Sequence, residues 1–225
     1  EFMMQSGFKK GRASPCAFWH PTRDIRCGVH GDDFTVLARE SELDWFWKQI
    51  QKRFECKHRG RLGPEDKDMK EIRVLNRIIT WTEEGIEYEG DQRHVEISMQ
   101  RAGIKEDRRE VTVPIEKTKR SQESPKALIP EHATNYRGIV ARLNFLGQDR
   151  SDIQYAVKEL SRGMSNPTIK HQERLKRLTR YLVDKSRDRT LFKYQSEVKE
   201  LVTFTDTDFA GCSRTRKSTS GGVIM

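Results

Sequence analysis

Residues 27–38 of this chain read Cys-Gly-Val-His-Gly-Asp-Asp-Phe-Thr-Val-Leu-Ala, which is the clearest strand-and-turn pattern in the first part of the sequence. Beyond the two acids, Phe34, Val36 and Ala38 occupy every second position. An apolar period of two is typical of a half-buried strand, and Gly-Asp-Asp is typical of a tight turn. The pattern predicts two short strands joined at residues 31–33.

Two adjacent acids, Asp32 and Asp33, stand at the tip of this predicted hairpin. Mg²⁺ prefers oxygen ligands and retains several waters, so a pair of carboxylates at a tip can hold it. Phosphoryl transfer by two metal ions requires a further carboxylate from a neighbouring strand. By itself the dipeptide is more typical of a solvent-exposed turn, because glycine and aspartate are common turn residues.

Downstream of the hairpin, Ser41 is predicted to cap a helix. Its apolar face comprises Leu43, Phe46, Trp47, Ile50 and Phe54, which follow helical spacing. Residues 57–71 are charged and broken by glycine and proline, which predicts a loop. Residues 72–81 and 86–88 predict a second hairpin, and residues 92–102 a short helix. Residues 105–135 show little periodicity and are predicted to form a linker.

Three amphipathic helices follow between residues 136 and 182. Their apolar faces are Tyr136, Ile139, Val140, Leu143 and Leu146; then Ile153, Ala156, Val157, Leu160 and Met164; then His171, Leu175, Leu178 and Leu182. Ser151-x-x-Gln154 resembles a capping box. Short joins predict a small helical bundle. Residues 198–209 alternate again and predict another strand.

Composition narrows the class of protein. The 225 residues include 43 Lys and Arg against 34 Asp and Glu, a formal charge of +9, which favours a polyanionic partner or simply a solvated basic surface. The apolar runs are too short to span a bilayer, and the first residues lack a signal-peptide pattern. Four scattered cysteines are typical of free thiols in a reducing compartment. We therefore expect an intracellular chain, cytoplasmic or nuclear, that is not secreted and has no membrane partner.

Longer motifs sharpen this expectation. Residues 136–146 read Tyr-Arg-Gly-Ile-Val-Ala-Arg-Leu-Asn-Phe-Leu, residues 150–157 Arg-Ser-Asp-Ile-Gln-Tyr-Ala-Val, residues 205–211 Thr-Asp-Thr-Asp-Phe-Ala-Gly and residues 216–221 Arg-Lys-Ser-Thr-Ser-Gly. Together with Ser-Pro-Cys-Ala-Phe at 14–18 and the Asp-Asp hairpin, they resemble the Pol polyprotein of copia-type retrotransposons. The resemblance covers the end of the reverse transcriptase and the opening of the ribonuclease H domain.

The resemblance implies an α+β chain. Residues 1–104 would be a partial polymerase palm, 105–135 a linker, 136–195 a three-helix thumb or connection, and 198–225 the truncated start of a ribonuclease-H-like fold. The implied function is that of a fragment of an RNA-directed DNA polymerase that binds nucleic acid. The alternative is a non-catalytic nucleic-acid-binding or structural remnant of a transposon polyprotein.

The resemblance also assigns site residues. Asp32 would ligate the catalytic metal with Asp33 beside it, and Asp206 would be the first catalytic acid of the ribonuclease part, all with Mg²⁺ as cofactor. Lys176, Arg177 and Arg180 lie close together on one predicted helix, and such a ridge suits phosphate contacts, although solvated basic faces are commonplace. The implied partner is an RNA/DNA template–primer duplex, with deoxynucleotides as substrates of the full-length enzyme.

Two features depart from the family pattern. His30 and Gly31 stand where the family has Tyr-Val before the two acids. The family's other palm aspartate has no counterpart by motif, so we expect no polymerisation by this chain alone. Were it active, Asp24 would have to supply the missing carboxylate. A competing zinc site, built from Cys16, His20, Cys27 and His30, has a spacing unlike common zinc fingers.

Overall fold

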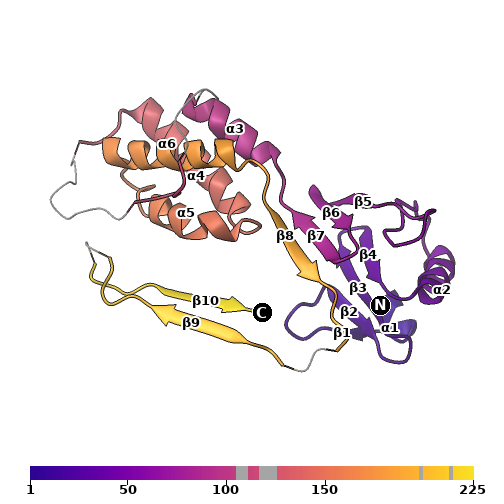
Figure 1. Ribbon diagram of the computed structural model, residues 1–225. Helices are drawn as coiled ribbons and strands as arrows, with labels where there is room; N and C mark the ends of the chain where they lie inside the picture. The colour runs from indigo at the N-terminus through magenta and orange to yellow at the C-terminus, as the bar shows by residue number, and fades with distance from the viewer. Residues whose placement is uncertain (105–110, 117–125, 198–199, 213–214) are drawn as a thin grey trace. The chain divides into compact units, whose positions relative to one another are not determined.

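The computed structural model describes residues 1–225 except 105–110, 117–125, 198–199 and 213–214. It divides the chain into two compact units, Glu1–Arg61 and Leu62–Met225, both of mixed α/β structure with antiparallel sheets (Figure 1). Parts of the predicted linker and the start of the predicted strand at 198–209 lie outside the described residues.

The first unit is a four-stranded sheet with helices on one face. Its elements are α1 (Phe2–Gln5), β1 (Lys9–Lys10), β2 (Ala17–His20), β3 (Ile25–His30), β4 (Asp33–Leu37) and α2 (Glu40–Gln51). The sheet order is β1-β2-β3-β4, and each pair is antiparallel. Ile25 and Cys27 of β3 pack with Phe46 and Ile50 of α2 in the core. Period-two burial in β3 thus meets one face of an amphipathic helix.

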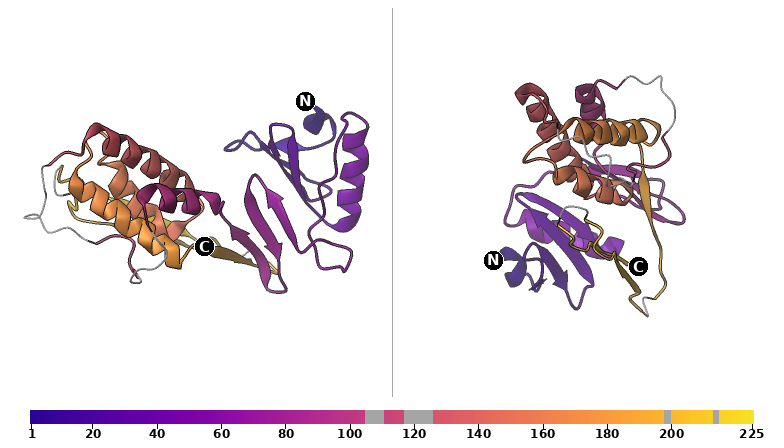
Figure 2. Two further views of the ribbon diagram at one scale, coloured as in Figure 1. Left: turned by 90° about the horizontal axis from the view of Figure 1, so that it is seen from above. Right: turned by 90° about the vertical axis from the view of Figure 1, so that its left-hand side faces the viewer.

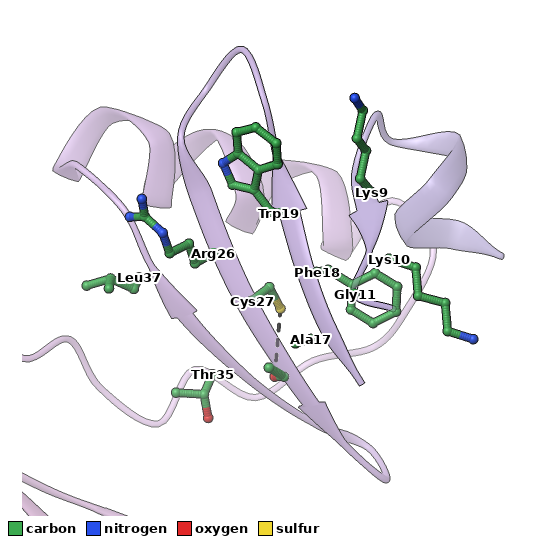
Figure 3. Close-up of a pocket in the computed structure, with 11 residues that line it drawn as sticks. Lys9, Lys10, Gly11, Ala17, Phe18, Trp19, Arg26, Cys27, Thr35 and Leu37 are labelled. Carbon is green, nitrogen blue, oxygen red and sulfur yellow. Dashed lines mark hydrogen bonds between the residues drawn. The ribbon is translucent and has the colours of Figure 1, made fainter. Parts of the chain in front are cut away.

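The first predicted hairpin is confirmed, because every residue of β4 pairs with a residue of β3, from Arg26 with Leu37 (Figure 3) to His30 with Asp33. The predicted cap of the next helix is wrong. Helix α2 begins at Glu40, so Ser41 lies inside the first turn, and Arg39 at the N-cap makes no side-chain cap bond. Glu40 and Glu42 in the first turn instead complement the positive end of the helix dipole.

The second unit begins with the strands β5 (Glu71–Val74), β6 (Arg77–Trp81) and β7 (Gly85–Glu89). The run 72–81, predicted as one strand, is in fact two strands. Leu75 and Asn76 between them have φ of 47° and 66°. Asparagine tolerates this left-handed region better than most residues, which permits a tight turn there.

A fourth strand joins this sheet from far along the chain. β8 (Arg189–Lys193) pairs antiparallel with β7, giving the order β5-β6-β7-β8. Gly85 faces it closely, since an added Cβ would lie 2.2 Å from the Phe192 carbonyl oxygen. A side chain at Gly85 would push β8 off the sheet edge.

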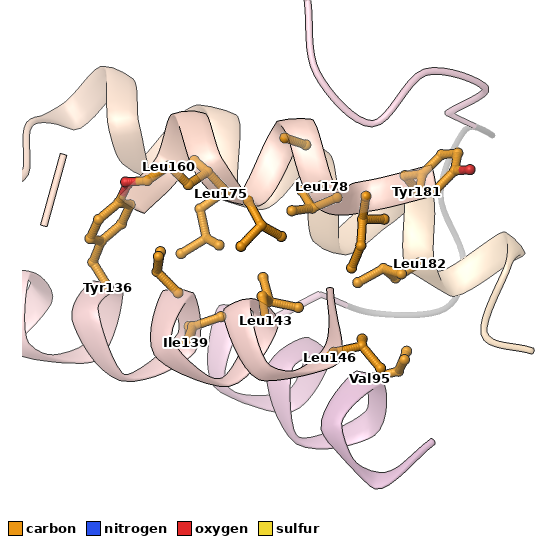
Figure 4. Packing of buried hydrophobic residues seen from close by; sticks show 14 residues of the cluster. Val95, Tyr136, Ile139, Leu143, Leu146, Leu160, Leu175, Leu178, Tyr181 and Leu182 are labelled. Carbon is orange, nitrogen blue, oxygen red and sulfur yellow. The ribbon is translucent and has the colours of Figure 1, made fainter. Parts of the chain in front are cut away.

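The helical bundle is formed by the part of the sequence between β7 and β8. Its elements are α3 (Arg93–Ala102), α4 (Pro130–Leu146), a 3₁₀ turn (Ser151–Ile153), α5 (Gln154–Ser161) and α6 (Ile169–Asp184). The three predicted helices pack around a shared core that includes Leu143, Leu160 and Leu178 (Figure 4). Helix α3 joins them through Val95, and Figures 1 and 2 show these helices side by side.

The ends of the bundle helices differ from expectation in two places. Helix α4 begins at Pro130, inside the segment predicted as a linker, because proline suits a first helical turn. The capping box predicted at Ser151 is wrong, since residues 151–153 form a 3₁₀ turn without a side-chain cap. A capping box occurs instead at Thr168, which exchanges hydrogen bonds with His171 before α6.

The chain closes with a separate hairpin of β9 (Thr203–Thr207) and β10 (Ser220–Ile224). Every residue of both strands is exposed. Its turn is tied to the bundle, because Lys158 Nζ on α5 donates to Thr219 Oγ1 at 2.7 Å. Because all residues of β9 and β10 are exposed, neither face of this hairpin packs against other described residues.

Candidate functional site

The tip of the β3–β4 hairpin presents both predicted acids to solvent. His30 and Asp33 are Cα partners at the end of the ladder, and Gly31 and Asp32 form the turn. Gly31 has φ +61°, a conformation that L side chains rarely adopt. Glycine at this position, which departs from the family pattern, therefore matches the turn that the backbone makes here.

The donors at this tip fit one hydrated Mg²⁺ but not a pair of metal ions. Asp32 and Asp33 are exposed and adjacent, and Mg²⁺ is commonly bound through one or two carboxylates with waters in the other positions. Among the residues that the structure describes, no group of three or more His, Cys, Asp or Glu side chains is placed to hold a metal. The bridging carboxylate of a two-metal site is thus not supplied by the described part of the chain.

Asp24 does not fill this gap. It lies in the turn before β3, whereas Asp32 follows β3, so the six-residue strand separates them. At the rise of an extended strand this separation is roughly 20 Å. Asp24 instead pairs with Arg26 at 3.1 Å. The acid expected to rescue activity is therefore at the wrong end of the strand.

The four zinc-type residues are not gathered either. Cys16 is exposed, whereas Cys27 and His20 are buried in the first unit's core region. Burial raises the pKa of the Cys27 thiol to about 12, and metals require the thiolate. The His20 ring packs edge-on against Phe8 and Trp45. The geometry favours core roles for Cys27 and His20.

The three cations of α6 have different surroundings. Lys176 is exposed. Arg177 is already engaged, because its Nε donates to the Val113 carbonyl at 3.1 Å and its Nη1 lies 2.7 Å from Glu116. Arg180 Nε is buried and has no hydrogen-bond partner in the described part of the chain. The predicted ridge is therefore part solvated face and part anchor for the segment 111–116.

The acids of the β9–β10 hairpin also differ from one another. Asp206 is an exposed strand residue opposite Gly221. Asp208 accepts backbone hydrogen bonds from Thr219 at 2.8 Å and Gly211 at 3.1 Å. These bonds, that from Thr219 foremost, lower the pKa of the Asp208 carboxyl. Asp208 therefore holds the hairpin turn, which leaves Asp206 as the acid open to a ligand.

Sequence reasoning missed the polar contacts that fix the β5–β8 sheet to the bundle. Asp149, just after α4, accepts from Tyr88 Oη at 2.6 Å and from Arg77 Nε at 3.1 Å. Buried Glu89 on β7 is paired with Arg187 at 2.7 Å, which lowers the pKa of its carboxyl. Only the tertiary pairing of distant segments brings these groups together, and no local motif marks them.

Among the described residues, no helix is both long enough and apolar enough to cross a membrane.

Known proteins supply relatives over part of the chain. The retrovirus-related Pol polyproteins from transposons RE1 and RE2 of Arabidopsis thaliana are each 38% identical over 91 residues, which is 40% of this chain and 6% of either polyprotein. An uncharacterized mitochondrial protein of the same plant is 36% identical over 88 residues, 39% of this chain and 36% of its own length. The matching region is thus a small part of the polyproteins.

No protein-family model matches the chain. No solved structure matches it either. The resemblance to transposon Pol polyproteins is confirmed by these relatives, whereas the palm and thumb assignments stay predictions.

Proposed function

We propose that this chain, a relative of transposon Pol polyproteins, is the part of an RNA-directed DNA polymerase that carries the Asp-Asp hairpin, the helical thumb and the opening of ribonuclease H. In this proposal it binds a template–primer duplex without extending the primer. The observation that carries it is the exposed pair Asp32 and Asp33 at the tip of the β3–β4 hairpin, in a chain related to Pol polyproteins.

The hairpin supports the metal part of the proposal. Asp32 and Asp33 would hold one Mg²⁺ with waters, and Asp206 would serve similarly in the ribonuclease part. Bound Mg²⁺ would neutralise and orient phosphate oxygens. The role of the chain itself is to present the two carboxylates on a turn fixed by Gly31 and by the full β3–β4 ladder.

The charge distribution supports duplex binding. The chain carries a formal charge of +9, and Lys176 projects from α6 into solvent. Contacts of this kind position a protein on the phosphate backbone without reading bases. Arg177 would contribute only after leaving Glu116, so we assign most of the helix contact to Lys176 and Arg180.

The lack of polymerisation follows from the donors at the tip. Two-metal phosphoryl transfer needs carboxylates that bridge both ions. The described residues bring no third carboxylate to Asp32 and Asp33, and Asp24 lies at the opposite end of β3. The same shortage favours the second candidate function, a non-catalytic remnant of a transposon polyprotein that retains binding only or no activity.

Primer extension separates polymerase from remnant. The purified chain is incubated with a primed RNA template, deoxynucleotides and Mg²⁺, beside the variant Asp32→Asn. We expect no extension from either protein. Extension by the parent above the variant would overturn the inactive assignment and would require an acid that we have not identified.

Duplex binding is tested by salt titration. Log affinity for a template–primer duplex should fall linearly with log salt, because counterions are released on binding. Lys176→Glu should reduce the slope by about 1 or more and weaken binding to all sequences alike. Lys48→Glu, the same reversal at an exposed position of α2, is the matched control. If both variants bind like the parent, the α6 cations are only a solvated face.

A further inference from the structure

The first turn of helix α6 is closed by two side chains, those of Thr168 and His171. The Thr168 hydroxyl oxygen accepts from the His171 backbone N–H at 3.5 Å, and the Thr168 backbone N–H donates to Nδ1 of the His171 ring at 3.1 Å. In the usual capping box a glutamate or glutamine occupies the position of this histidine. Histidine differs from both because it gains or loses a ring proton near neutral pH.

The hydrogen bond from Thr168 fixes where the ring of His171 carries its proton. A backbone N–H can only donate, so the Nδ1 atom that accepts from it must hold a free lone pair. The neutral ring therefore has its proton on Nε2. In the protonated ring both nitrogens are donors. Nδ1 could then donate only to the Thr168 hydroxyl oxygen, 3.0 Å away, and the Thr168 N–H would lose its acceptor.

The capping box lies where the chain before α4 is fastened to the bundle. Residues 126–128 form a short antiparallel bridge with residues 167–169. The Leu128 N–H donates to the Pro167 carbonyl at 2.9 Å, and the opposite bond, from the Ile169 N–H, is 3.1 Å long. Leu128 is also packed, partly buried, against the bundle core. An open capping box would therefore loosen the bridge as well as the helix end.

The ring of His171 is closely packed between two other elements. Gly163, in the turn after α5, lies so near that an added Cβ would be 2.8 Å from the ring atoms Cγ and Cδ2. The ring of Tyr136 on α4 lies 6.2 Å away between centroids. Burial raises the pKa of the Tyr136 hydroxyl, which donates to the Leu160 carbonyl at 2.7 Å (Figure 4). The imidazole thus has little room to turn away from the N-cap.

The charges around this ring oppose a further positive charge. Within a turn of the contact points, the described charged and titratable groups are Lys170, Glu173 and Arg174 on α6, His132 and Arg137 on α4, Glu159 and Arg162 at the end of α5, and Lys126. Glu159 is already paired with Arg162 at 3.1 Å. The first turn of α6 contains no acidic residue, and a helix N-terminus disfavours cations.

We propose that the capping box of Thr168 and His171 is a pH-sensitive switch that controls the start of α6. While the ring is neutral, the box is closed and residues 126–128 stay fastened to the helix. Protonation removes the acceptor of the Thr168 N–H and places a positive charge at the helix N-terminus, so the first turn frays and the bridge is released. The switch is a property of the bundle and is independent of the nucleic-acid binding proposed above.

His94 on α3 is a competing source of pH dependence in the same bundle. Its Nδ1 lies 3.2 Å from Nη1 of Arg142, and burial, foremost, lowers the pKa of its ring. Protonation of His94 would act on the contact between α3 and α4, whereas protonation of His171 acts directly on the Thr168 amide. Measurements on single residues therefore distinguish the two histidines.

The first test needs no substitution. In long-range ¹H–¹⁵N spectra of the full chain near pH 8, His171 should show an unprotonated Nδ1 and a protonated Nε2. Between about pH 8 and pH 5, where histidines ordinarily titrate, hydrogen exchange of the Thr168 amide, corrected for its intrinsic pH trend, should accelerate roughly tenfold, the scale of one hydrogen bond. The midpoint should coincide with the titration of the His171 ring, and the Leu128 amide should follow it. A proton on Nδ1 at pH 8, or exchange that ignores the ring, would overturn the proposal.

His171→Gln is the discriminating variant, because glutamine completes a capping box without titrating in this range. Its Thr168 amide should be as well protected at pH 5 as at pH 8. His132→Gln is the matched control, since His132 is exposed in the first turn of α4, whose N-cap makes no side-chain hydrogen bond. It should keep the pH profile of the parent.

Two results with the variants would overturn the switch. One is a His171→Gln protein with native helix content whose Thr168 amide still responds to pH like that of the parent. The other is loss of that response in His94→Gln while His171→Gln retains it, which would assign the pH dependence to α3. Should His171→Gln fail to fold, the ring tautomer and the shared midpoint in the parent chain decide the question.

Discussion

The β3–β4 hairpin and the β9–β10 hairpin each present an aspartate, but their strands are supported in different ways. In the first, Ile25 and Cys27 are buried against α2. In the second, every strand residue is exposed, including Phe204 and Val223. An isolated two-stranded hairpin is marginally stable in water. An acid on a hairpin is therefore held firmly in space only when the strands that carry it are packed.

The anchors of the two hairpins are correspondingly different in kind. The first relies on apolar burial, which grows with the area removed from water. The second has no buried strand residue; its turn is held by the bond from the Thr219 backbone to Asp208, by the bond from Lys158 to the Thr219 hydroxyl, and by buried Cys212. Burial resists pH and salt, whereas exposed polar contacts do not.

The largest expected effect is on the packed hairpin. Ile25 is fully buried at 0% exposure, so Ile25→Ala should destabilise the first unit by about 3 kcal/mol through lost burial and the cavity left behind. Phe204→Ala, at 59% exposure in β9, should change stability by less than about 0.5 kcal/mol. Urea unfolding followed by tryptophan fluorescence measures the first, because Trp45 and Trp47 lie in that unit.

The stability of the Phe204→Ala variant is measured by urea unfolding followed by circular dichroism. Equal destabilisation by the two substitutions would show that the β9–β10 strands bury apolar surface after all, and the contrast between the hairpins would collapse.

A second way to sharpen the contrast uses two buried cysteines as reporters. Cys27 lies in β3 and Cys212 in the turn region of the β9–β10 hairpin, and both are buried at 3% and 7% exposure. Local opening exposes weakly packed segments before global unfolding. Cys212 should therefore be alkylated at lower urea than Cys27, as measured by pulse labelling and mass spectrometry. Exposed Cys16 is the internal control and should react at once.

One result of the labelling experiment would contradict this prediction. If Cys27 reacts together with Cys212 across the urea series, the two hairpins open as one cooperative unit, and the weaker support of β9–β10 would be refuted.

Local patterns predicted much of this fold, because their causes are local. The alternation of Phe34, Val36 and Ala38 together with the Gly-Asp-Asp turn predicted the β3–β4 hairpin, and helical spacing predicted the faces of α2, α4, α5 and α6, all of which the structure contains. Turns were predicted less successfully from the sequence than strands and helices. Asn76 was the available signal for the β5–β6 turn, but the apolar run around it favoured a continuous strand.

Long-range pairing could not be predicted in the same way. β8 pairs directly with β7, although all the helices of the bundle lie between the two strands in the sequence. No pattern near residue 190 indicates that partner. The candidate site shows the same division. The exposed tip with Asp32 and Asp33 was predicted from its neighbours, whereas the engagement of Arg177 by Glu116 depends on which segments meet.

A smaller effect concerns pH and the turn of the second hairpin. The folded pKa of Asp208 is depressed, so its contribution is present above the unfolded value near 3.9 and is lost as pH falls through the folded value. The Thr219 amide should therefore exchange faster with solvent below about pH 4, beyond the intrinsic pH trend. Asp208→Asn should remove this dependence, and Asp206→Asn should not. An unchanged pH profile in Asp208→Asn would assign the effect to another acid.

The smallest expected effect is at the tip of the packed hairpin, and it decides whether the tip is a site or a structural part. Asp32 and Asp33 are exposed, and the β3–β4 ladder beneath them is complete without their side chains. Asp32→Ala and Asp33→Ala should each change the free energy of unfolding by less than about 0.5 kcal/mol, as is usual for exposed positions. A loss of several kcal/mol on either change would show that the carboxylates stabilise the turn, and their availability to a cation would then be in doubt. Changes near zero would show that the two carboxylates make no interaction that stabilises the folded state. Both acids could then bind a ligand without loss of stability. The urea series used for Ile25→Ala measures all three variants on one scale.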